Sequence, residues 1–326
     1  MAKEIVNNIF SVGSSTFQDL ALQIFQFQYS NNEVYRQWVD ALQISPVQVK
    51  EICQIPFLPV SFFKTNRVIT GAFQPEYTFE SSGTTGMINS RHFVKDLSVY
   101  FESFINGFKL FYGEPEKWCI IGLLPSYLER SGSSLITMVD KLISLSGKKE
   151  SGFYLFELEK LAETLKMLEE KKQKTLLIGV TFALLDFAEK YPMELRYTTL
   201  METGGMKGRR KEMIREEVHA CLQQQFQVPA VHSEYGMTEL LSQAYSRQEG
   251  IFNTVPWMKV LVRDEDDPLL VRQQGRGMIN IIDLANIYSC SFIATDDAGR
   301  VFEDGSFEVT GRRDNSDIRG CSLMAV

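Results

Sequence analysis

The chain has 326 residues, of which 44% are hydrophobic and 23% are charged, with 41 acidic side chains against 34 basic ones. This balance is typical of a folded globular protein and excludes a disordered one. The formal charge of −7 argues against a nucleic-acid-binding protein that relies on a broad basic surface. A chain of this length predicts either two domains of ordinary size or one large α/β domain.

Five cysteines are scattered along the chain, and none has the spacing of a metal-binding pair. Because their number is odd and there are only three histidines, we expect neither a disulfide framework nor a zinc site. Residues 1–15 lack the apolar core of a signal peptide, and no window reaches the ~18 apolar residues that a membrane span needs. We therefore expect a cytoplasmic protein with free thiols.

The apolar pattern predicts, in chain order, a mostly helical lead-in over residues 1–75, an α/β body over 76–254 and a β-rich subdomain over 255–326. In the body, helical spacing is found over 93–111, 131–143, 158–168, 182–190 and 214–226. Short apolar runs typical of buried strands lie at 118–124, 175–180 and 197–201. This alternation predicts βαβ units and a mostly parallel sheet. In the last part, short strands are expected at 260–262, 269–271, 278–282, 292–294 and 307–310.

A hydroxyl-rich loop lies between an apparent strand and a helix. It consists of Ser81, Ser82, Gly83, Thr84, Thr85 and Gly86. Its glycines let the backbone approach a ligand closely, and its hydroxyl and N–H groups can donate to an anion. The loop lacks the ending of a Walker A motif. We favour phosphate binding over the alternative, a plain polar surface loop.

A second segment, Tyr235-Gly236-Met237-Thr238-Glu239, follows an apparent strand end. A tyrosine ring can stack on a base, a hydroxyl can contact a phosphate and a carboxylate can hold Mg²⁺. In isolation the segment is equally compatible with a turn in which Glu239 begins a helix.

A third set of polar residues lies in the expected β-rich part, at 295–300, 303–305 and 311–314. Asp296 and Asp297 can accept hydrogen bonds from ribose hydroxyls, and Arg312 suits phosphate or ribose oxygens. The alternative is a pair of Asp/Gly turns at 295–300 and 303–305.

The order of these motifs resembles that of the adenylate-forming (acyl-AMP ligase) superfamily. The sequence is more similar still to its acyl-protein synthetase branch, the family of the fatty-acid ligase subunit of bacterial luciferase systems, through residues 124–134, 202–208 and 314–324. The resemblance runs from about Ile55 to the C-terminus. It implies one adenylation core over residues 1–326, with a large α/β body of layered sheets and helices and a small β-rich subdomain. The lid domain of the superfamily is expected to be absent.

The resemblance also implies roles in binding ATP and Mg²⁺. The loop from Ser81 to Gly86 would hold the β- and γ-phosphates. Gly204 and Gly205 would lie against the adenine, on which Tyr235 would stack. Thr238 would contact the α-phosphate, and Glu239 would bind Mg²⁺.

Further roles follow for the end of the chain. Asp297 matches the ribose-binding aspartate, with Asp296 where the superfamily usually has glycine, and Arg312 would also reach the ribose. Cys321 would receive the acyl group as a thioester, with Arg312 and Arg319 nearby to lower its pKa. The alternative for Cys321 is a small, partly buried residue with no chemical role.

Two departures from the superfamily concern positive charge. Its phosphate loop usually continues to a Pro-Lys pair, whereas residues 87–92 follow here, with Arg91 as an electrostatic substitute. The chain also ends at Val326, where a lid bearing a catalytic lysine normally begins. Lys64 is a candidate replacement, although we favour an ordinary surface lysine at this position.

The function that the resemblance implies is ATP-dependent activation of a carboxylic, and specifically a fatty, acid as acyl-AMP. The acyl group would then pass to a thiol, either Cys321 or an external acceptor such as an acyl carrier, CoA or a reductase partner protein. One alternative is an acyltransferase that needs no ATP. Another is a non-catalytic nucleotide-binding subunit of an acyl-handling complex. The acyl pocket would be lined near Tyr127, Gly179, Val180 and Phe182, for which core packing is the default interpretation.

Overall fold

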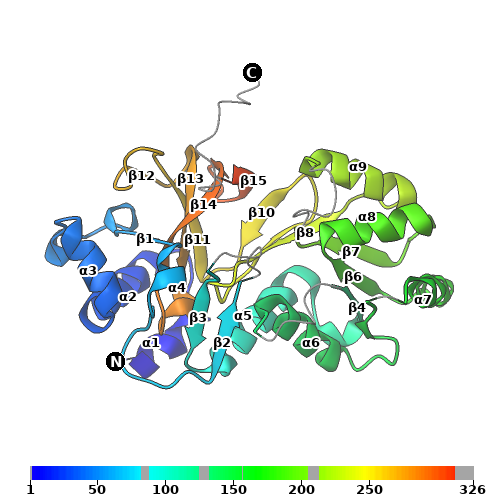
Figure 1. Cartoon of the computed structure of the whole chain (residues 1–326), viewed down its shortest axis with the longest axis horizontal. Coiled ribbons are helices and arrows are strands. Elements are labelled where there is room, and N and C mark those ends of the chain that lie inside the picture. The colour runs from blue at the N-terminus through cyan, green and yellow to red at the C-terminus, as the bar shows by residue number, and fades with distance from the viewer. Residues whose placement is uncertain (1, 82–87, 125–131, 156, 205–212, 313–326) are drawn as a thin grey trace.

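The computed structural model describes residues 2–81, 88–124, 132–155, 157–204 and 213–312 (Figure 1). In these ranges, one 13-stranded sheet runs through the molecule in the order β12-β11-β13-β14-β15-β10-β9-β8-β7-β6-β4-β5, with β1 paired to β14. A separate hairpin is formed by β2 and β3. The molecule is therefore a mixed α/β fold, as the sequence predicts.

The first half of the sheet is parallel. Its strands are β4 (Cys119–Leu123), β5 (Gly152–Phe153), β6 (Thr175–Gly179), β7 (Thr198–Glu202) and β8 (His232–Tyr235). Every residue of β4 and β6 is buried, which explains why these strands read as continuous apolar runs rather than alternating ones. The strands expected at 118–124, 175–180 and 197–201 are thus confirmed.

Helices cover both faces of this half, with α5 and α6 on one side and α8 and α9 on the other (Figure 1). Ser133 caps α6 by accepting a hydrogen bond from the Ile136 N–H (3.3 Å). The helices are α5 (Leu97–Tyr112), α6 (Ser134–Ser146), α7 (Leu158–Glu170), α8 (Thr181–Lys190) and α9 (Arg215–Phe226).

The second half of the sheet is antiparallel apart from the β1–β14 pair. Its strands are β1 (Leu58–Pro59), β9 (Ala244–Ser246), β10 (Ile251–Thr254), β11 (Met258–Arg263), β12 (Val271–Arg272), β13 (Gly275–Asp283), β14 (Phe292–Val301) and β15 (Phe307–Arg312). Residues 295–300 lie inside β14, so the alternative of an Asp/Gly turn there is wrong. The turn at 303–305 is present, because the Gly305 N–H donates to the Phe302 carbonyl (3.0 Å).

The N-terminal helices pack on this antiparallel half (Figure 1). Buried Gln28 of α2 donates to the carbonyls of Asn286 and Ile287 (3.0 Å each) and accepts from the Ser291 N–H (2.9 Å). The elements are α1 (Ala2–Ile9), α2 (Phe17–Asn31), α3 (Glu33–Ala41), α4 (Phe62–Thr65) and the short 3₁₀ turns η1 (Pro46–Gln48), η2 (Ile52–Gln54), η3 (Pro115–Lys117) and η4 (Leu284–Asn286). The helical lead-in is therefore part of the same packed body.

The hairpin of β2 (Tyr77–Glu80) and β3 (Arg91–Val94) differs from the expectation of a helix from residue 93. Asp96 explains the later start of α5, because its carboxylate accepts from the Ser98 N–H (2.9 Å) as an N-cap. The expected phosphate loop thus joins two antiparallel strands rather than a strand and a helix. None of the helices in the described ranges combines the length and apolar character that crossing a membrane requires.

Candidate active site

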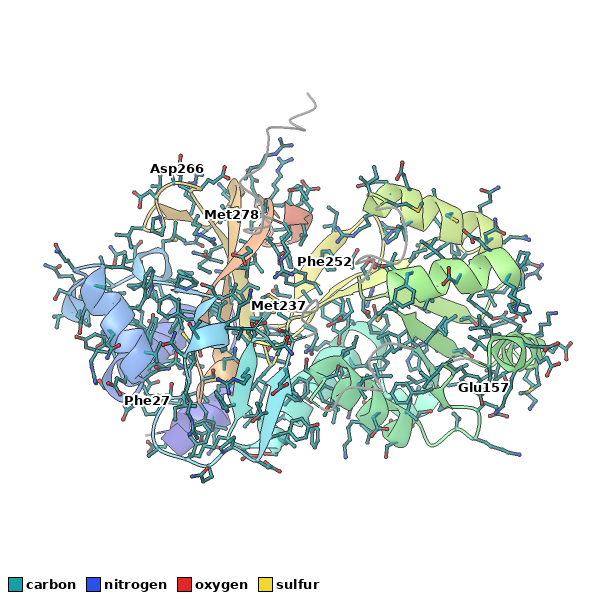
Figure 2. All side chains as sticks on the ribbon, in the orientation of Figure 1. Phe27, Glu157, Met237, Phe252, Asp266 and Met278 are labelled. Atoms are coloured by element: carbon teal, nitrogen blue, oxygen red, sulfur yellow. The ribbon has the colours of Figure 1, made fainter. Side chains whose placement is uncertain are left out.

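The candidate residues gather at the carboxyl ends of β7 and β8, where the parallel half of the sheet meets the antiparallel half. Figure 2 shows Met237, which follows β8, near Phe252 of β10 in the middle of the molecule. In open α/β sheets, ligands bind beyond the carboxyl ends of the strands. The position is therefore that of a ligand site.

Glu202, at the end of β7, connects several segments of this region through hydrogen bonds. Its Oε2 accepts from Thr181 Oγ1 (2.9 Å) and from the Gly204 N–H (2.8 Å), and its Oε1 accepts from Ser233 Oγ (2.9 Å). Arg215 Nε and His219 Nε2 each lie 3.7 Å from Oε1. Burial alone would raise the pKa of Glu202, but these partners outweigh burial and hold it at about 2.

Gly204 follows directly and has a φ of +73°, in the left-handed region that favours glycine. Its N–H is tied to Glu202, and its carbonyl accepts from the Thr181 N–H (3.0 Å). The backbone at Gly204 is thus held in one conformation beside β8. Gly205 lies outside the described residues.

Tyr235, Asp297 and Arg312 form a connected group. The Tyr235 hydroxyl donates to Asp297 Oδ2 (2.7 Å), and Arg312 Nε lies 3.9 Å from Asp297 Oδ1. The β14–β15 register places Asp297 directly opposite Arg312. Burial, together with the nearby Asp297 carboxylate, raises the pKa of Tyr235 well above its usual range, so its hydroxyl stays protonated.

The Tyr235 ring is held edge-on by two phenylalanines, Phe252 at 5.8 Å and Phe307 at 5.5 Å between ring centres. These residues come from β10 and β15, on the antiparallel side. The aromatic contacts fix the ring at the junction of the two halves.

Thr238 and Glu239 are linked to the β2–β3 hairpin. His92 Nδ1 lies 2.9 Å from the Thr238 carbonyl, and Ser90 hydrogen-bonds the Glu239 carboxyl group. Burial lowers the pKa of His92 to about 4, so its ring is neutral and donates from Nδ1. The Ser90 N–H also donates to Ser81 Oγ (2.8 Å). Ser81, the first residue of its loop, is therefore connected to Glu239 by two hydrogen bonds that both involve Ser90.

Glu239 is only 5% exposed. Burial raises its pKa, while the Ser90 hydrogen bond and the positive charges of Arg312 and Lys64 oppose this rise. Lys64 of α4 is half-buried, and its charge makes the smallest of these contributions at Glu239.

Asp283, at the end of β13, is a positioning residue that sequence reasoning missed. Its Oδ2 accepts from the N–H groups of Leu241 (2.8 Å) and Ser242 (3.0 Å), and its Oδ1 accepts from Ser242 Oγ (2.6 Å). Burial raises its pKa to about 6 despite these donors. The only hint in the sequence was an acidic residue directly after the apolar run 278–282.

A resident Mg²⁺ is compatible with Glu239. The described residues contain no group of three His, Cys, Asp or Glu side chains that could bind a metal ion by themselves. Mg²⁺ in nucleotide sites is held by one or two carboxylates together with phosphate oxygens, so a single buried carboxylate suffices.

Several other expectations concern residues outside this group. Ser82, Gly83, Thr84, Thr85, Gly86, Tyr127 and Cys321 lie outside the described residues. Cys53, Cys119, Cys221 and Cys290 are free thiols. Gly179 and Val180 are buried in the core.

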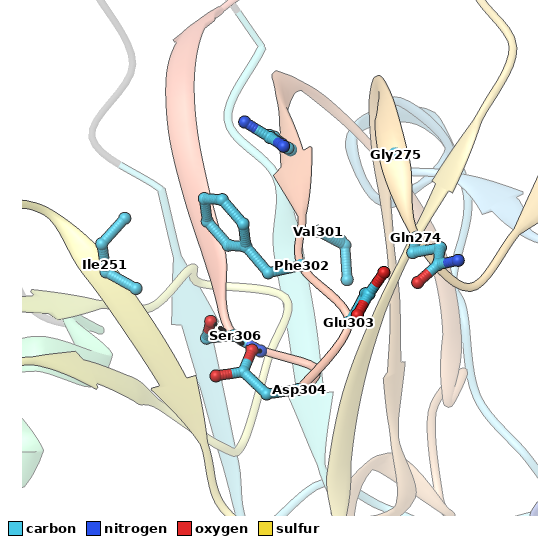
Figure 3. Close-up of a pocket in the computed structure, with 9 residues that line it drawn as sticks. Ile251, Gln274, Gly275, Val301, Phe302, Glu303, Asp304 and Ser306 are labelled. Carbon is cyan, nitrogen blue, oxygen red and sulfur yellow. Dashed lines mark hydrogen bonds between the residues drawn. The ribbon is translucent and has the colours of Figure 1, made fainter.

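A surface cavity lies elsewhere, at the turn between β14 and β15 (Figure 3). Its lining includes Ile251, Gln274 and Phe302, and Asp304 accepts from Ser306 Oγ (2.6 Å) beside it. Arg300, Glu303 and Asp304, from the polar ranges 295–300 and 303–305, line this cavity, whereas Tyr235, Asp297 and Arg312 do not.

Comparison with known proteins adds two findings on the fold. ATP-bound MatB from Rhodopseudomonas palustris has a TM-score of 0.55 at 17% identity, over 74% of this chain and 49% of MatB. A 2-hydroxyisobutyryl-CoA ligase in complex with R3-HIB-AMP has a TM-score of 0.59 at 10% identity, over 94% of this chain and 70% of the ligase. At these identities the likeness concerns the fold alone, and the chain spans about half the length of MatB.

No curated protein matches the sequence. A family model described as "Acyl-protein synthetase, LuxE" matches residues 12–325.

Proposed function

Because the chain belongs to the LuxE family of acyl-protein synthetases, we propose that it converts a carboxylic acid and ATP into acyl-AMP and passes the acyl group to a thiol. The observation that supports this most is the group formed by Tyr235, Asp297 and Arg312, linked electrostatically to Glu239. Three motifs that are distant in sequence thus meet at the carboxyl ends of the parallel strands.

In this proposal the group binds the nucleoside. The adenine lies against Gly204 and the Tyr235 ring, and the Asp297 carboxylate accepts hydrogen bonds from the ribose hydroxyls. Because Tyr235 and Arg312 already orient Asp297, the carboxylate needs little rearrangement when ATP binds. Arg312 contacts the ribose from the opposite strand.

The chemical step joins the acid to the α-phosphate. A carboxylate oxygen of the acid attacks the α-phosphorus, the bond between the α- and β-phosphates breaks, and pyrophosphate leaves with the electron pair. Thr238 and the loop beginning at Ser81 bind the phosphates, and Lys64 supplies positive charge near Glu239. Mg²⁺, held by Glu239, neutralises phosphate charge when bound.

The second step transfers the acyl group. A thiolate attacks the carbonyl carbon of the acyl-AMP, the carbon–oxygen bond to the phosphate breaks, and AMP leaves as a thioester forms. Cys321 is our first candidate for the thiol, with CoA, an acyl carrier or a reductase partner protein as the final acceptor. Because the thioester step needs a reduced thiol, a cytoplasmic location is part of the proposal. A fatty acid is the substrate class that the family suggests.

Acid-dependent exchange of pyrophosphate into ATP, with Mg²⁺ present, tests the first step. We expect exchange with at least one carboxylic acid, and we expect Asp297→Asn to lower it about tenfold or more at subsaturating ATP. The neighbouring Asp296→Asn is the matched control and should change exchange less than about twofold. Folded protein that shows no exchange with a broad panel of acids would contradict the proposal.

Radiolabelled acid tests the role of Cys321. We expect Cys321→Ser to retain pyrophosphate exchange and to lose covalent labelling of the protein, because only the thioester step needs the thiol. Labelling that survives the substitution removes Cys321 from the mechanism. Acyl transfer from a thioester without ATP would instead identify an ATP-independent acyltransferase.

A further inference from the structure

The strand that carries Tyr235 has a second face, directed toward α5, that the proposed mechanism leaves unused. Ser233 and Tyr235 point to the nucleotide side, where they contact Glu202 and Asp297. Glu234 lies on the other face, paired with Tyr245 of β9. Extending this register by one residue beyond Tyr235 and Ala244 brings Gly236 opposite Gln243 on the same face as Glu234.

Two polar groups on this face have no partner. Gln243 is 5% exposed, and its Oε1 accepts no hydrogen bond from the part of the chain that the structure describes. Within the same ranges, no hydrogen bond or ion pair to the Glu234 carboxyl group is formed. Buried polar groups are nearly always paired, because an unpaired one costs the free energy of its lost hydration. The buried Gln243 oxygen therefore calls for a partner, and the carboxyl group of Glu234, which is only half-buried, lies on the same face.

Gly236, which has no Cβ atom, lets the Glu234 carboxyl group pack closely against its backbone, next to Gln243. A Cβ atom at this position would lie 2.5 Å from Glu234 Oε1 and 3.5 Å from Gln243 Cγ. Gly236 itself is exposed, and it lies between Tyr235 and Thr238, the residues proposed to hold the adenine and the α-phosphate. The carboxyl group of Glu234 thus borders the place where the acid must meet ATP.

The charges around Glu234 define what it can bind. Burial, with a smaller contribution from the Glu202 carboxylate, raises the pKa of Glu234 to about 8, so the group is a neutral acid at pH 7. The phenols of Tyr100, Tyr112 and Tyr245 beside it are neutral, because burial raises their pKa values above the usual range. A neutral carboxyl group donates one hydrogen bond, and Gln243 Oε1 accepts one.

A hydroxyl group complements this pair, because it accepts from Glu234 and donates to Gln243 at the same time. A plain hydrocarbon chain would leave both groups unpaired, and a second carboxylate would be repelled by Glu202 and by any ionised Glu234. We propose that Glu234 and Gln243 bind a hydroxyl group of the carboxylic acid, so that the enzyme selects hydroxy acids over unsubstituted ones. This inference rests on the proposed acid activation.

Matched pairs of acids that differ in one hydroxyl group test the inference. Pyrophosphate exchange is measured with α- and β-hydroxybutyrate against butyrate and with α- and β-hydroxyoctanoate against octanoate. For at least one pair, we expect kcat/KM for the hydroxy acid to exceed that of its partner by about tenfold or more. Glu234→Leu and Gln243→Leu should each bring this ratio close to one, mainly by lowering kcat/KM for the hydroxy acid.

Glu234→Gln is the conservative variant, because its amide still donates a hydrogen bond. It should retain part of the selectivity that Glu234→Leu loses, which a general loss of packing would not produce. Exchange that favours the unsubstituted acid in every pair, or a ratio that survives both leucine variants, overturns the inference and leaves the proposed function standing. Absence of exchange with every acid overturns the proposed function, and the inference with it.

Discussion

Glu202 shows how one side chain determines the local geometry of the candidate site. It receives hydrogen bonds from Thr181, Gly204 and Ser233, which belong to three different segments, and it faces the charge of Arg215. A buried carboxylate is tolerated only with such compensation. Its ionised form is therefore a structural requirement, and the conformation of Gly204 depends on it.

Stability should accordingly depend on the ionisation of Glu202. Its pKa is about 4.5 in an unfolded chain and about 2 in the folded protein, so its contribution is complete above pH 4.5 and disappears as the pH falls toward 2. The shift corresponds to roughly 3 kcal/mol at pH 7. Urea unfolding should show that Glu202→Gln destabilises the protein by about this amount at pH 7 and by clearly less at pH 3.

Exposed Glu163 offers a control for that measurement, since Glu163→Gln should leave stability nearly unchanged at both pH values. A Glu202→Gln variant whose destabilisation does not depend on pH would show that packing, rather than charge, dominates at this position.

At the scale of elements, the β2–β3 hairpin is attached to the rest of the site by polar contacts and by the packing of buried Phe79 on Tyr100 of α5. It is not a strand pair of the large sheet. His92 bonds the Thr238 carbonyl, Ser90 bonds Glu239, and the Glu80 N–H donates to the Gly132 carbonyl (2.8 Å). The aromatic ring of His92 also packs edge-on against Phe63 of α4, at 5.9 Å between ring centres.

Two substitutions of His92 separate hydrogen bonding from packing. His92→Phe keeps a ring but loses the Nδ1 donor, so the Thr238 carbonyl loses its partner at a cost of about 1–3 kcal/mol. His92→Asn keeps a donor near the same position and loses the ring. We expect His92→Phe to cause the larger loss of pyrophosphate exchange, because the hairpin then loses its connection to Thr238.

Hydrogen exchange of the β3 amides provides a second measurement for this pair. His92→Phe should increase their exchange rates relative to those in β13. If His92→Asn lowers pyrophosphate exchange as much as His92→Phe does, ring packing rather than the hydrogen bond to Thr238 connects the hairpin to the site.

At the scale of the whole molecule, the sheet joins the two halves without interruption. The path runs from parallel β8 through β9, β10 and β15 to β14, with backbone ladders at each step. Tyr235 of β8 bonds Asp297 of β14 across this junction. The strands of 255–312 therefore continue the sheet of the α/β body.

Such continuity predicts that both halves unfold together. Native-state hydrogen exchange compares the buried amides of Leu177 in β6 and Ile281 in β13. We expect equal free energies of opening and equal dependence on denaturant, because neither half retains its ladder once the junction opens. A difference of more than about 1 kcal/mol would identify two separately unfolding units.

Local regularities in the sequence predicted most of the elements. Strands β4, β6 and β7 were recognisable because both of their faces are buried, and α6 because Ser133 is a good N-cap. Strand β3 was missed because its apolar residues also suit the helix that follows. Residues 295–300 resembled a turn, since Asp and Gly are common in turns and their place within β14 depends on pairing with distant strands.

The sequence by itself determined the order of the motifs and the chemical types that they offer, because these are properties of consecutive residues. It thereby pointed to Tyr235, Glu239, Asp297 and Arg312 individually. Only the tertiary structure decided that these residues are connected, that Lys64 acts on Glu239, and that Glu234 and Gln243 share a face without partners. Such contacts join residues far apart in sequence, and their energies depend on burial and on strand register, which no local pattern records.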